Sequence, residues 1–554
     1  MKKKYNYIFA FFVLISLSSC DDALNVTPYN SLTDATIYDT PDRIELAVTG
    51  VYDAAQSGFY PEGLAPRGYT FGAANLEQDD LRGEDMISME SFYQITYNNT
   101  YTTTSPNCYN IWNNSYALIN KVNVVLEGLA SATSRNIISQ TTGSAYEGEL
   151  RFLRALAMHQ LLIEFAKPYA DGQGAKLGVI IRDFAIKDDA TIAKANSIGR
   201  SSVADCYKFI EDDLTFAENH LPATRTSNKT YRATQAAAIA LKMRVLLHEG
   251  KWDDVIAEGN QIVKESGTSF VSPIGNWTLT ATPDGPFANN ASIENIFSIE
   301  NTSTDNGAVS GALQSMYGSN GTSVGARGLI GISPIIWNLP QWDASDLRRN
   351  LAVANFTNDT PSTAPSGKKP MYFTNKYRDP SWGDDAPQIR YAEVLLALAE
   401  AYVRSKGAVD STALSYLNAV RNRAVTTTSK QYTLSSFATS TDFIIAVLAE
   451  RRIEFLGEGK RWGDIHRLSL DPLFNNSKLA GDVNAITAGI PAKVLPATIT
   501  SSNFKTLYSG KTAYSAIPKT QNALTYDDYR FIWPIPATEI TNSLNGVVAQ
   551  NPSY

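Results

Sequence analysis

Much of this chain repeats apolar residues every three to four positions, which is the spacing of one buried helix face. We expect helices over residues 41–56, 109–129, 145–165, 202–220, 233–248, 252–264, 391–405 and 410–424. The helices over 233–248 and 252–264 are separated by three residues, so they must fold back as an antiparallel pair. The last two helices form a second such pair around Gly407. These pairs resemble tetratricopeptide repeats.

Between the helix pairs, residues 267–388 are rich in Gly, Asn, Ser and Pro, and only 296–299 and 371–373 look like strands. Long irregular segments in compact proteins are commonly functional. The pattern therefore predicts a mainly α protein with a scaffold of tetratricopeptide-like helix pairs and a loop-rich half containing a few short strands. We expect helical repeats over about 39–266 and 389–470, a binding region over about 267–388, and a loop-rich C-terminal part over 471–554.

The N-terminus has the composition of a lipoprotein signal peptide. Lys2, Lys3 and Lys4 precede an apolar run over 8–17, and Leu17-Ser18-Ser19-Cys20 matches a lipobox. We expect residues 1–19 to be removed, Cys20 to be acylated, and 20–38 to form a tether to a single body over 39–554. Several acyl chains on one residue anchor a protein stably. No other run approaches the roughly 18 apolar residues of a membrane span.

Charge and cysteine content narrow the possible functions. Removing residues 1–19 leaves 45 basic against 55 acidic residues, a net charge of −10, which argues against nucleic acid as a partner. Cys108 and Cys206 lack the spacing of a zinc site, so we expect no metal and no cofactor. Both buried free thiols and a single disulfide remain open for these cysteines.

A series of motifs in a fixed order resembles the SusD/RagB family of outer-membrane lipoproteins. The motifs lie at 149–155, 236–252, 389–401, 417–424, 450–464, 533–536 and 550–554. The resemblance implies a cell-surface protein that binds a nutrient, expected to be a glycan, without catalysis. It also implies pairing with a SusC-like TonB-dependent transporter in the outer membrane. Capture of a peptide or another nutrient in a RagB-like uptake pair is the alternative.

Charged residues within these motifs are expected to hold the scaffold together, because their helical spacing allows ion pairs within and between repeats. They are Arg151, Arg154, Glu393, Glu400, Arg421, Arg423, Arg451, Arg452 and Glu454.

An envelope hydrolase is the less favoured reading. Residues 321–325 match GxSxG, but loops flank them where a nucleophile elbow needs a strand and a helix. The pairs Asp79-Asp80, Asp384-Asp385 and Asp527-Asp528 are expected to be solvated or turn-forming. The histidines are expected in the core or on the surface without a catalytic context: His159, His220, His248 and His466. We therefore expect no catalytic residues.

A glycan binder needs aromatic faces together with polar groups that bond hydroxyls. Trp112, Trp252, Trp462 and Trp533 are expected in the core, whereas Trp277, Trp337, Trp342 and Trp382 fall in or beside the loop-rich half. The resemblance places the ligand against the loops before the helix at 112–123 and against the insert after the strand at 296–299. The candidate ligand residues in these regions are Tyr97, Asn98, Tyr101, Tyr317, Arg327, Trp337 and Trp342, with Tyr93, Asn99 and Asn320 beside them.

Overall fold

The computed structural model describes residues 36–59, 66–227, 229–266, 269–473 and 489–554, and it is mainly helical. Its helices are α2 (Pro41–Ser57), α3 (Ala73–Arg82), α4 (Ser91–Tyr97), α5 (Pro106–Ser134), α6 (Gln140–Phe165), α7 (Asp189–Asn196), α8 (Val203–His220), α9 (Gln235–Glu249), α10 (Trp252–Ile262), α11 (Gly285–Ala288), α12 (Leu313–Tyr317), α13 (Pro334–Trp337), α14 (Tyr391–Lys406), α15 (Ser411–Asn422), α16 (Ser440–Glu454), α17 (Arg461–Leu468), α18 (Phe504–Leu507) and α19 (Ala537–Asn542). Among the described residues, none of these helices is long and apolar enough to cross a membrane. The predicted tether and Cys20 lie outside the described residues.

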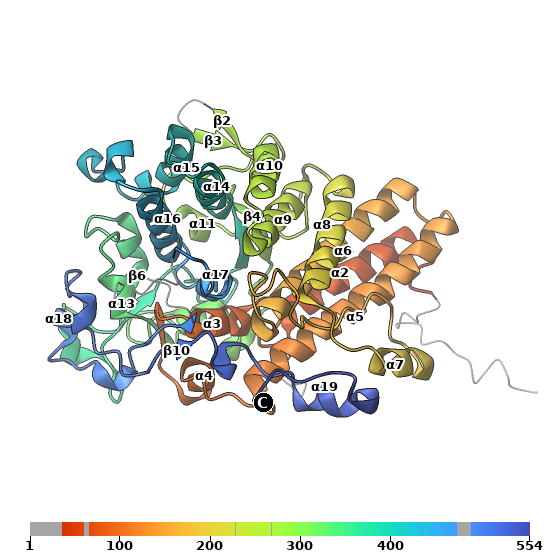
Figure 1. Cartoon of the computed structure of the whole chain (residues 1–554), viewed down its shortest axis with the longest axis horizontal. Helices are drawn as coiled ribbons and strands as arrows, with labels where there is room; N and C mark the ends of the chain where they lie inside the picture. Colours follow the sequence, from red (N-terminus) through yellow and green to blue (C-terminus); the bar gives the residue numbers. More distant parts are fainter. Residues whose placement is uncertain (1–35, 60–65, 228, 267–268, 474–488) are drawn as a thin grey trace, which may run out of the picture.

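The scaffold is a row of helices in which each packs against the next: α5 on α6, α6 on α8, α8 on α9, α9 on α10, α10 on α14, and α14 on α15 and α16. Figure 1 shows α5, α6 and α8 on one side of the molecule and α14, α15 and α16 on the other. All eight helices predicted from periodicity are present, with ends shifted by a few residues. The turns after α9 and α14 use Gly250 (φ 75°) and Gly407 (φ 68°), where a side chain would strain the backbone.

The strands are short and form antiparallel pairs. They are β1 (Met86–Ser88), β2 (Lys264–Ser266), β3 (Ser269–Val271), β4 (Asn295–Ile299), β5 (Ile330–Ile332), β6 (Ala352–Ala354), β7 (Tyr372–Thr374), β8 (Ala386–Arg390), β9 (Gly489–Ile490) and β10 (Leu524–Thr525). The pairs are β1–β5, β2–β3, β4–β8, β6–β7 and β9–β10. The two predicted strands correspond to β4 and β7.

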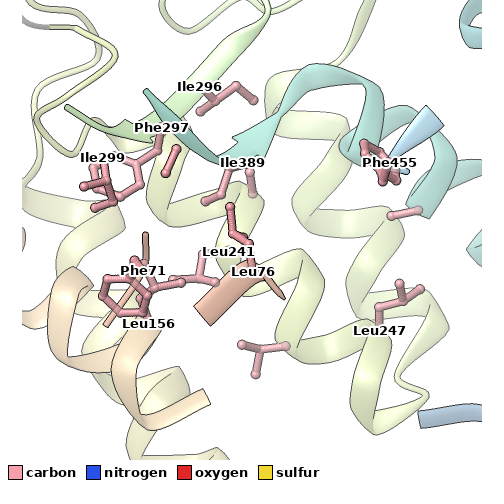
Figure 2. Close-up of a cluster of buried hydrophobic side chains, with 14 of the residues drawn as sticks. Phe71, Leu76, Leu156, Leu241, Leu247, Ile296, Phe297, Ile299, Ile389 and Phe455 are labelled. Carbon is pink, nitrogen blue, oxygen red and sulfur yellow. The ribbon is translucent and has the colours of Figure 1, made fainter. Parts of the chain in front are cut away.

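The β4–β8 pair joins the loop-rich half to the helical scaffold. Figure 2 shows Phe297 of β4 and Ile389 of β8 on the side of the helices that carry Leu156 and Leu241. All four side chains are buried in the main hydrophobic cluster. Burial of this shared apolar surface fixes the loop-rich half against α6 and α9.

Buried ion pairs confirm the structural role predicted for the charged motifs. Arg390 pairs with Glu294 (2.6 Å), Glu454 (2.9 Å) and Glu458 (2.8 Å), and Arg423 pairs with Glu294 and Glu454. The other predicted scaffold residues also form ion pairs, namely Arg151, Arg154, Glu393, Glu400, Arg421, Arg451 and Arg452.

Two predictions about acidic pairs are wrong. Asp79 and Asp80 are buried in α3, and Asp384 and Asp385 are buried beside β8, because neighbouring side chains and backbone N–H groups surround them. Of the three pairs, Asp527-Asp528 is accessible to solvent as expected, since Asp527 is exposed and Asp528 is partly exposed. Cys108 and Cys206 are buried free thiols, which decides between the two alternatives left open.

Candidate functional site

A pocket of about 360 Å³ lies between α3, α4 and the loop over residues 307–329. Its lining residues are Arg67, Tyr69, Ala74, Glu90, Ser91, Phe92, Tyr93, Ser310, Arg327 and Leu329. The lining combines three aromatic rings with two arginines and several hydroxyl groups. It also joins the two sequence regions in which a ligand was expected, one before α5 and the other after β4.

The walls of the pocket meet because of strand pairing and a close approach of two loops. β1 pairs with β5, and the Met89 N–H donates to the Leu329 carbonyl (2.8 Å), which places residues 89–93 beside 327–329. Gly311 packs against the backbone of Arg67, where a Cβ would lie 2.7 Å from the Arg67 Cα atom. Residue 311 must therefore be glycine for this wall to close.

A buried lysine fixes the two helices that carry part of the lining. Lys493 Nζ donates to the Leu81 carbonyl (2.6 Å) and to the Tyr97 carbonyl (3.1 Å), at the C-terminal ends of α3 and α4. Burial and the nearby Arg82 lower the pKa of Lys493 well below its usual value. The C-terminal part of the chain thus holds α3 and α4 together behind the pocket.

The acidic groups near the pocket contribute little negative charge to it. Glu77 is fully buried, and burial raises the pKa of its carboxyl group well above its usual value, although Tyr93 and Arg327 act in the opposite direction. Glu90, on the pocket wall, forms an ion pair with Lys368 (2.8 Å). Burial therefore disfavours the charged form of Glu77, and the charge of Glu90 is compensated.

Of the candidate ligand residues, Arg327 and the neighbouring Tyr93 line this pocket. Tyr97, Tyr101 and Tyr317 are buried, and their hydroxyl groups donate to the Val494 carbonyl (2.7 Å), the Arg530 carbonyl and the Asp80 carboxylate (2.7 Å), respectively. Asn98 is partly exposed, and its carbonyl accepts from Gln521 (3.1 Å). Contact between a ligand and any of these four residues stays a prediction.

Three of the four tryptophans in or beside the loop-rich half are buried. Trp337 is buried, stacks on Tyr372 with ring centroids 4.3 Å apart, and donates to the Tyr508 carbonyl (2.8 Å). Trp342 is buried between Trp337 and Arg349, and Trp277 is also buried. Of the tryptophans expected in the core, Trp112, Trp462 and Trp533 are buried and Trp252 is partly buried.

Trp382 is the partly exposed exception, and it lies beside unused hydrogen-bonding groups. Its φ of 68° is unusual for a bulky residue. The Trp382 indole N–H and the Gln314 side-chain oxygen are both buried without a partner in the described structure. A Cβ at Gly325 would lie 3.7 Å from the first atom and 3.8 Å from the second. Both of these unpartnered groups therefore lie close to Gly325.

Sequence reasoning missed Arg67, Tyr69 and Phe92. The adjacent aromatic pair Phe92-Tyr93, in the region expected to bind ligand before α5, was the available signal. Arg67 and Tyr69 had no comparable signal, because only the close approach of Gly311 brings their segment to the pocket.

A larger groove of about 730 Å³ lies between α2 and α5. Its lining consists mainly of aliphatic side chains, glycines and the stems of lysines, with Tyr38 as its aromatic residue. It offers fewer convergent polar and aromatic groups than the pocket beside α3 and α4, which remains the better candidate site.

Two family models match the two halves of the chain. A model described as "SusD family" matches residues 337–554, and one described as "Starch-binding associating with outer membrane" matches residues 24–247. A SusD-like protein from Formosa agariphila is 25% identical over 508 residues, covering 84% of this chain and 91% of that protein. Both halves of the chain are therefore similar to SusD-like proteins.

Solved structures share the fold. A SusD superfamily protein from Bacteroides fragilis has a TM-score of 0.69 and 25% identity, covering 92% of this chain and 99% of the other. One from Bacteroides thetaiotaomicron has a TM-score of 0.70 and 23% identity, covering 93% and 100%. A laminarin-binding SusD-like protein has a TM-score of 0.63 and 20% identity, covering 93% and 100%. SusD-like proteins are binding proteins, and the second family model's name associates them with the outer membrane.

Proposed function

We propose that this protein is a cell-surface lipoprotein that binds a glycan in the pocket beside α3 and α4 and delivers it to a SusC-like TonB-dependent transporter. The observation that carries the proposal is the lining of that pocket. Phe92 supplies a partly exposed ring, the mostly buried rings of Tyr69 and Tyr93 lie beside it, and Arg67 and Arg327 supply hydrogen-bond donors. Binding sites for small molecules combine an apolar, aromatic lining with a few placed polar groups in this way.

The size and surroundings of the pocket support an oligosaccharide ligand. Its volume of about 360 Å³ falls within the roughly 300–1,000 Å³ usual for ligand sites. Trp382 is partly exposed and lies against Gly325, two residues before Arg327, so its ring is placed to contact a second sugar unit. A chain of sugar units could contact both places.

The same geometry argues for binding without hydrolysis. Glycosidases place two carboxyl groups on opposite sides of the scissile bond, roughly 5–10 Å apart. Among the described residues that line the pocket, Glu90 is the single carboxylate, and it is paired with Lys368. Glu77 is fully buried and does not reach the pocket surface.

Location at the outer membrane rests on the lipobox and on the family. Acylation of Cys20 would tether the body, and the name of the second family model associates such proteins with the outer membrane. A SusC-like transporter would then lie in the same membrane as the anchored protein and could receive the ligand that the pocket binds.

Native affinity electrophoresis of the protein lacking residues 1–20, across a panel of polysaccharides, tests the proposal. We expect one polymer to retard the protein without the appearance of new reducing ends. Phe92→Ala and Trp382→Ala should weaken retardation about tenfold, whereas Tyr529→Ala, which removes a ring that is 43% exposed and outside the pocket, should leave it unchanged. Trp342 is buried, so Trp342→Ala also removes packing against Trp337 and Arg349 and is a less specific test of the site.

Three outcomes would contradict the proposal. Retardation by no polymer, together with binding of an oligopeptide mixture, would favour the RagB-like alternative. Cleavage of a polymer would establish a hydrolase. Equal weakening by Tyr529→Ala and Phe92→Ala would place the ligand elsewhere.

A further inference from the structure

The pocket has an excess of positive charge in an acidic protein. The whole chain carries a net charge of −7. Among the described pocket-lining residues, the charged groups are Arg67, Arg327 and Glu90. Glu90 is compensated by Lys368, whereas neither arginine forms an ion pair with any described residue. Two cationic groups are therefore left uncompensated at the pocket surface.

Arg327 is positioned but not neutralised. Its Nη1 atom donates to the Val309 carbonyl (3.2 Å) and the Ser310 hydroxyl (3.4 Å), both of which are uncharged acceptors. Its backbone N–H donates to the Ser315 carbonyl (2.8 Å), which holds the residue at the end of α12. The side chain is exposed, so the rest of the guanidinium remains available to a ligand.

Hydrogen bonds and a close backbone contact also hold Arg67 in place. Its N–H donates to the Ser57 carbonyl (3.0 Å), its carbonyl accepts from Ala74 (3.2 Å), and Gly311 packs against its Cα atom. Its side chain is partly exposed on the same pocket wall as Arg327. Two arginines on fixed backbone segments lose little freedom when they bind one ligand.

The nearest buried acid does not cancel this charge. Glu77 lies beneath the pocket, next to Tyr93 and within electrostatic range of Arg327. No ion pair joins Glu77 to Arg327 in the described structure, and burial disfavours the charged form of the Glu77 carboxyl group, so it offers the arginine little compensation. The planar guanidinium groups match the oxygens of a carboxylate or a sulfate, which they can bind through two parallel hydrogen bonds.

We propose that Arg67 and Arg327 bind an anionic group on the ligand, so that the pocket selects a glycan bearing carboxylate or sulfate groups over a neutral one. This inference rests on the proposed glycan-binding function. Tyr69, Phe92 and Tyr93 would then pack against the sugar ring that carries the charge.

Isothermal titration calorimetry with chemically matched polymers tests it on the protein lacking residues 1–20. One pair is a polyuronate and its carboxyl-reduced form, and the other is a sulfated galactan and its desulfated form. We expect the charged member of one pair to bind at least tenfold more tightly than its neutral form, and the responsive pair identifies carboxylate or sulfate as the recognised group. Added salt should weaken that binding.

Charge-removing variants assign the effect to the pocket. Arg67→Gln and Arg327→Gln should each weaken binding of the charged polymer about tenfold and change binding of the neutral form less than twofold. Arg135→Gln removes an arginine that pairs with Asp39 outside this pocket, so it should leave both affinities unchanged. Circular dichroism melts would verify that all three variants fold.

The contrary outcomes separate this inference from the proposed function. Equal affinity for charged and neutral forms, or equal weakening of both by Arg327→Gln, overturns the anionic selectivity and leaves glycan binding standing. If neither the four polymers nor a wider panel of neutral polysaccharides binds the protein, both proposals are overturned. Binding of an acidic peptide in place of every polymer would assign the arginines to a peptide ligand and would also overturn both.

Discussion

At the scale of single residues, Asp80 is a buried carboxyl group with a raised pKa. It accepts hydrogen bonds from the Tyr317 hydroxyl (2.7 Å) and the Gly459 N–H (3.1 Å). Burial outweighs these bonds and raises the pKa of Asp80 from 3.8 to about 7. The side chain joins α3, which carries part of the pocket wall, to α12 and to the turn after α16.

Asp80→Asn should make stability less dependent on pH. In the folded state Asp80 keeps its proton up to about pH 7, while the unfolded side chain loses it near pH 4. The native state therefore binds more protons between these values, and its contribution to stability falls as pH rises through this window. Urea unfolding at pH 5 and pH 8 should show a smaller decrease for Asp80→Asn than for the natural protein.

Asp527→Asn is the matched control, because Asp527 is exposed. Its stability should change with pH as that of the natural protein does. If Asp80→Asn and Asp527→Asn show the same pH dependence, Asp80 does not hold a proton in the folded state.

The sequence predicted which charged residues form ion pairs better than it predicted where the tryptophan rings lie. The arginines and glutamates of the helical motifs could be assigned to ion pairs because helical spacing defines their neighbours. The burial of Trp337 could not be predicted, because it depends on Tyr372 and Tyr508, which come from distant segments. Arg327 was found through the resemblance, whereas Arg67 depends on a tertiary contact with Gly311.

At the scale of elements, buried arginines connect helices that are far apart in sequence. Arg390 ends β8 and reaches Glu294 beside β4, Glu454 on α16 and Glu458 in the following turn. Arg348 pairs with Glu450 and also with Glu454 on α16. Ion pairs as well as apolar contacts therefore join the loop-rich half to α16.

Arg390→Ala should lower the free energy of unfolding by about 3–5 kcal/mol, because it leaves buried carboxylates without their partner. Denaturant unfolding measures this loss. Lys208→Ala, which removes one member of an exposed i,i+4 pair with Asp212, should cause no measurable change. Similar losses for the two variants would contradict a structural role for the Arg390 network.

Periodicity predicted most of the long helices, but it missed α16 as well as the shorter α3 and α4. The α3 sequence Ala-Ala-Asn-Leu-Glu-Gln-Asp-Asp-Leu-Arg contains more polar than apolar residues, yet all ten are buried. No amphipathic pattern can reveal a helix that is covered on every side. Because α3 and α4 carry part of the pocket, the same limit explains why the site could be predicted only as a region.

At the scale of the whole molecule, one body carries the candidate pocket. Its N-terminal region is expected to be anchored to the membrane. The described chain begins near α2, and Figure 1 shows α2 beside α5 and α6. Helix α3 lies against the C-terminal end of α6, where Arg82 pairs with Glu164. The two family models cover 24–247 and 337–554, so each half of the scaffold matches independently. The division into signal peptide, tether and single body stays a prediction.

Cys20→Ala tests the anchor on which the surface function depends. Without a thiol at the predicted processing site there is no attachment point for acyl chains, so the variant should lose labelling by radioactive palmitate in a Gram-negative host. It should also leave the outer-membrane fraction, because no described helix can replace the anchor. Cys108→Ser and Cys206→Ser alter buried thiols and should keep both the label and the location. Membrane retention of Cys20→Ala would mean that the protein is held there by a partner, and extraction with high salt would then distinguish a transporter contact from lipid insertion.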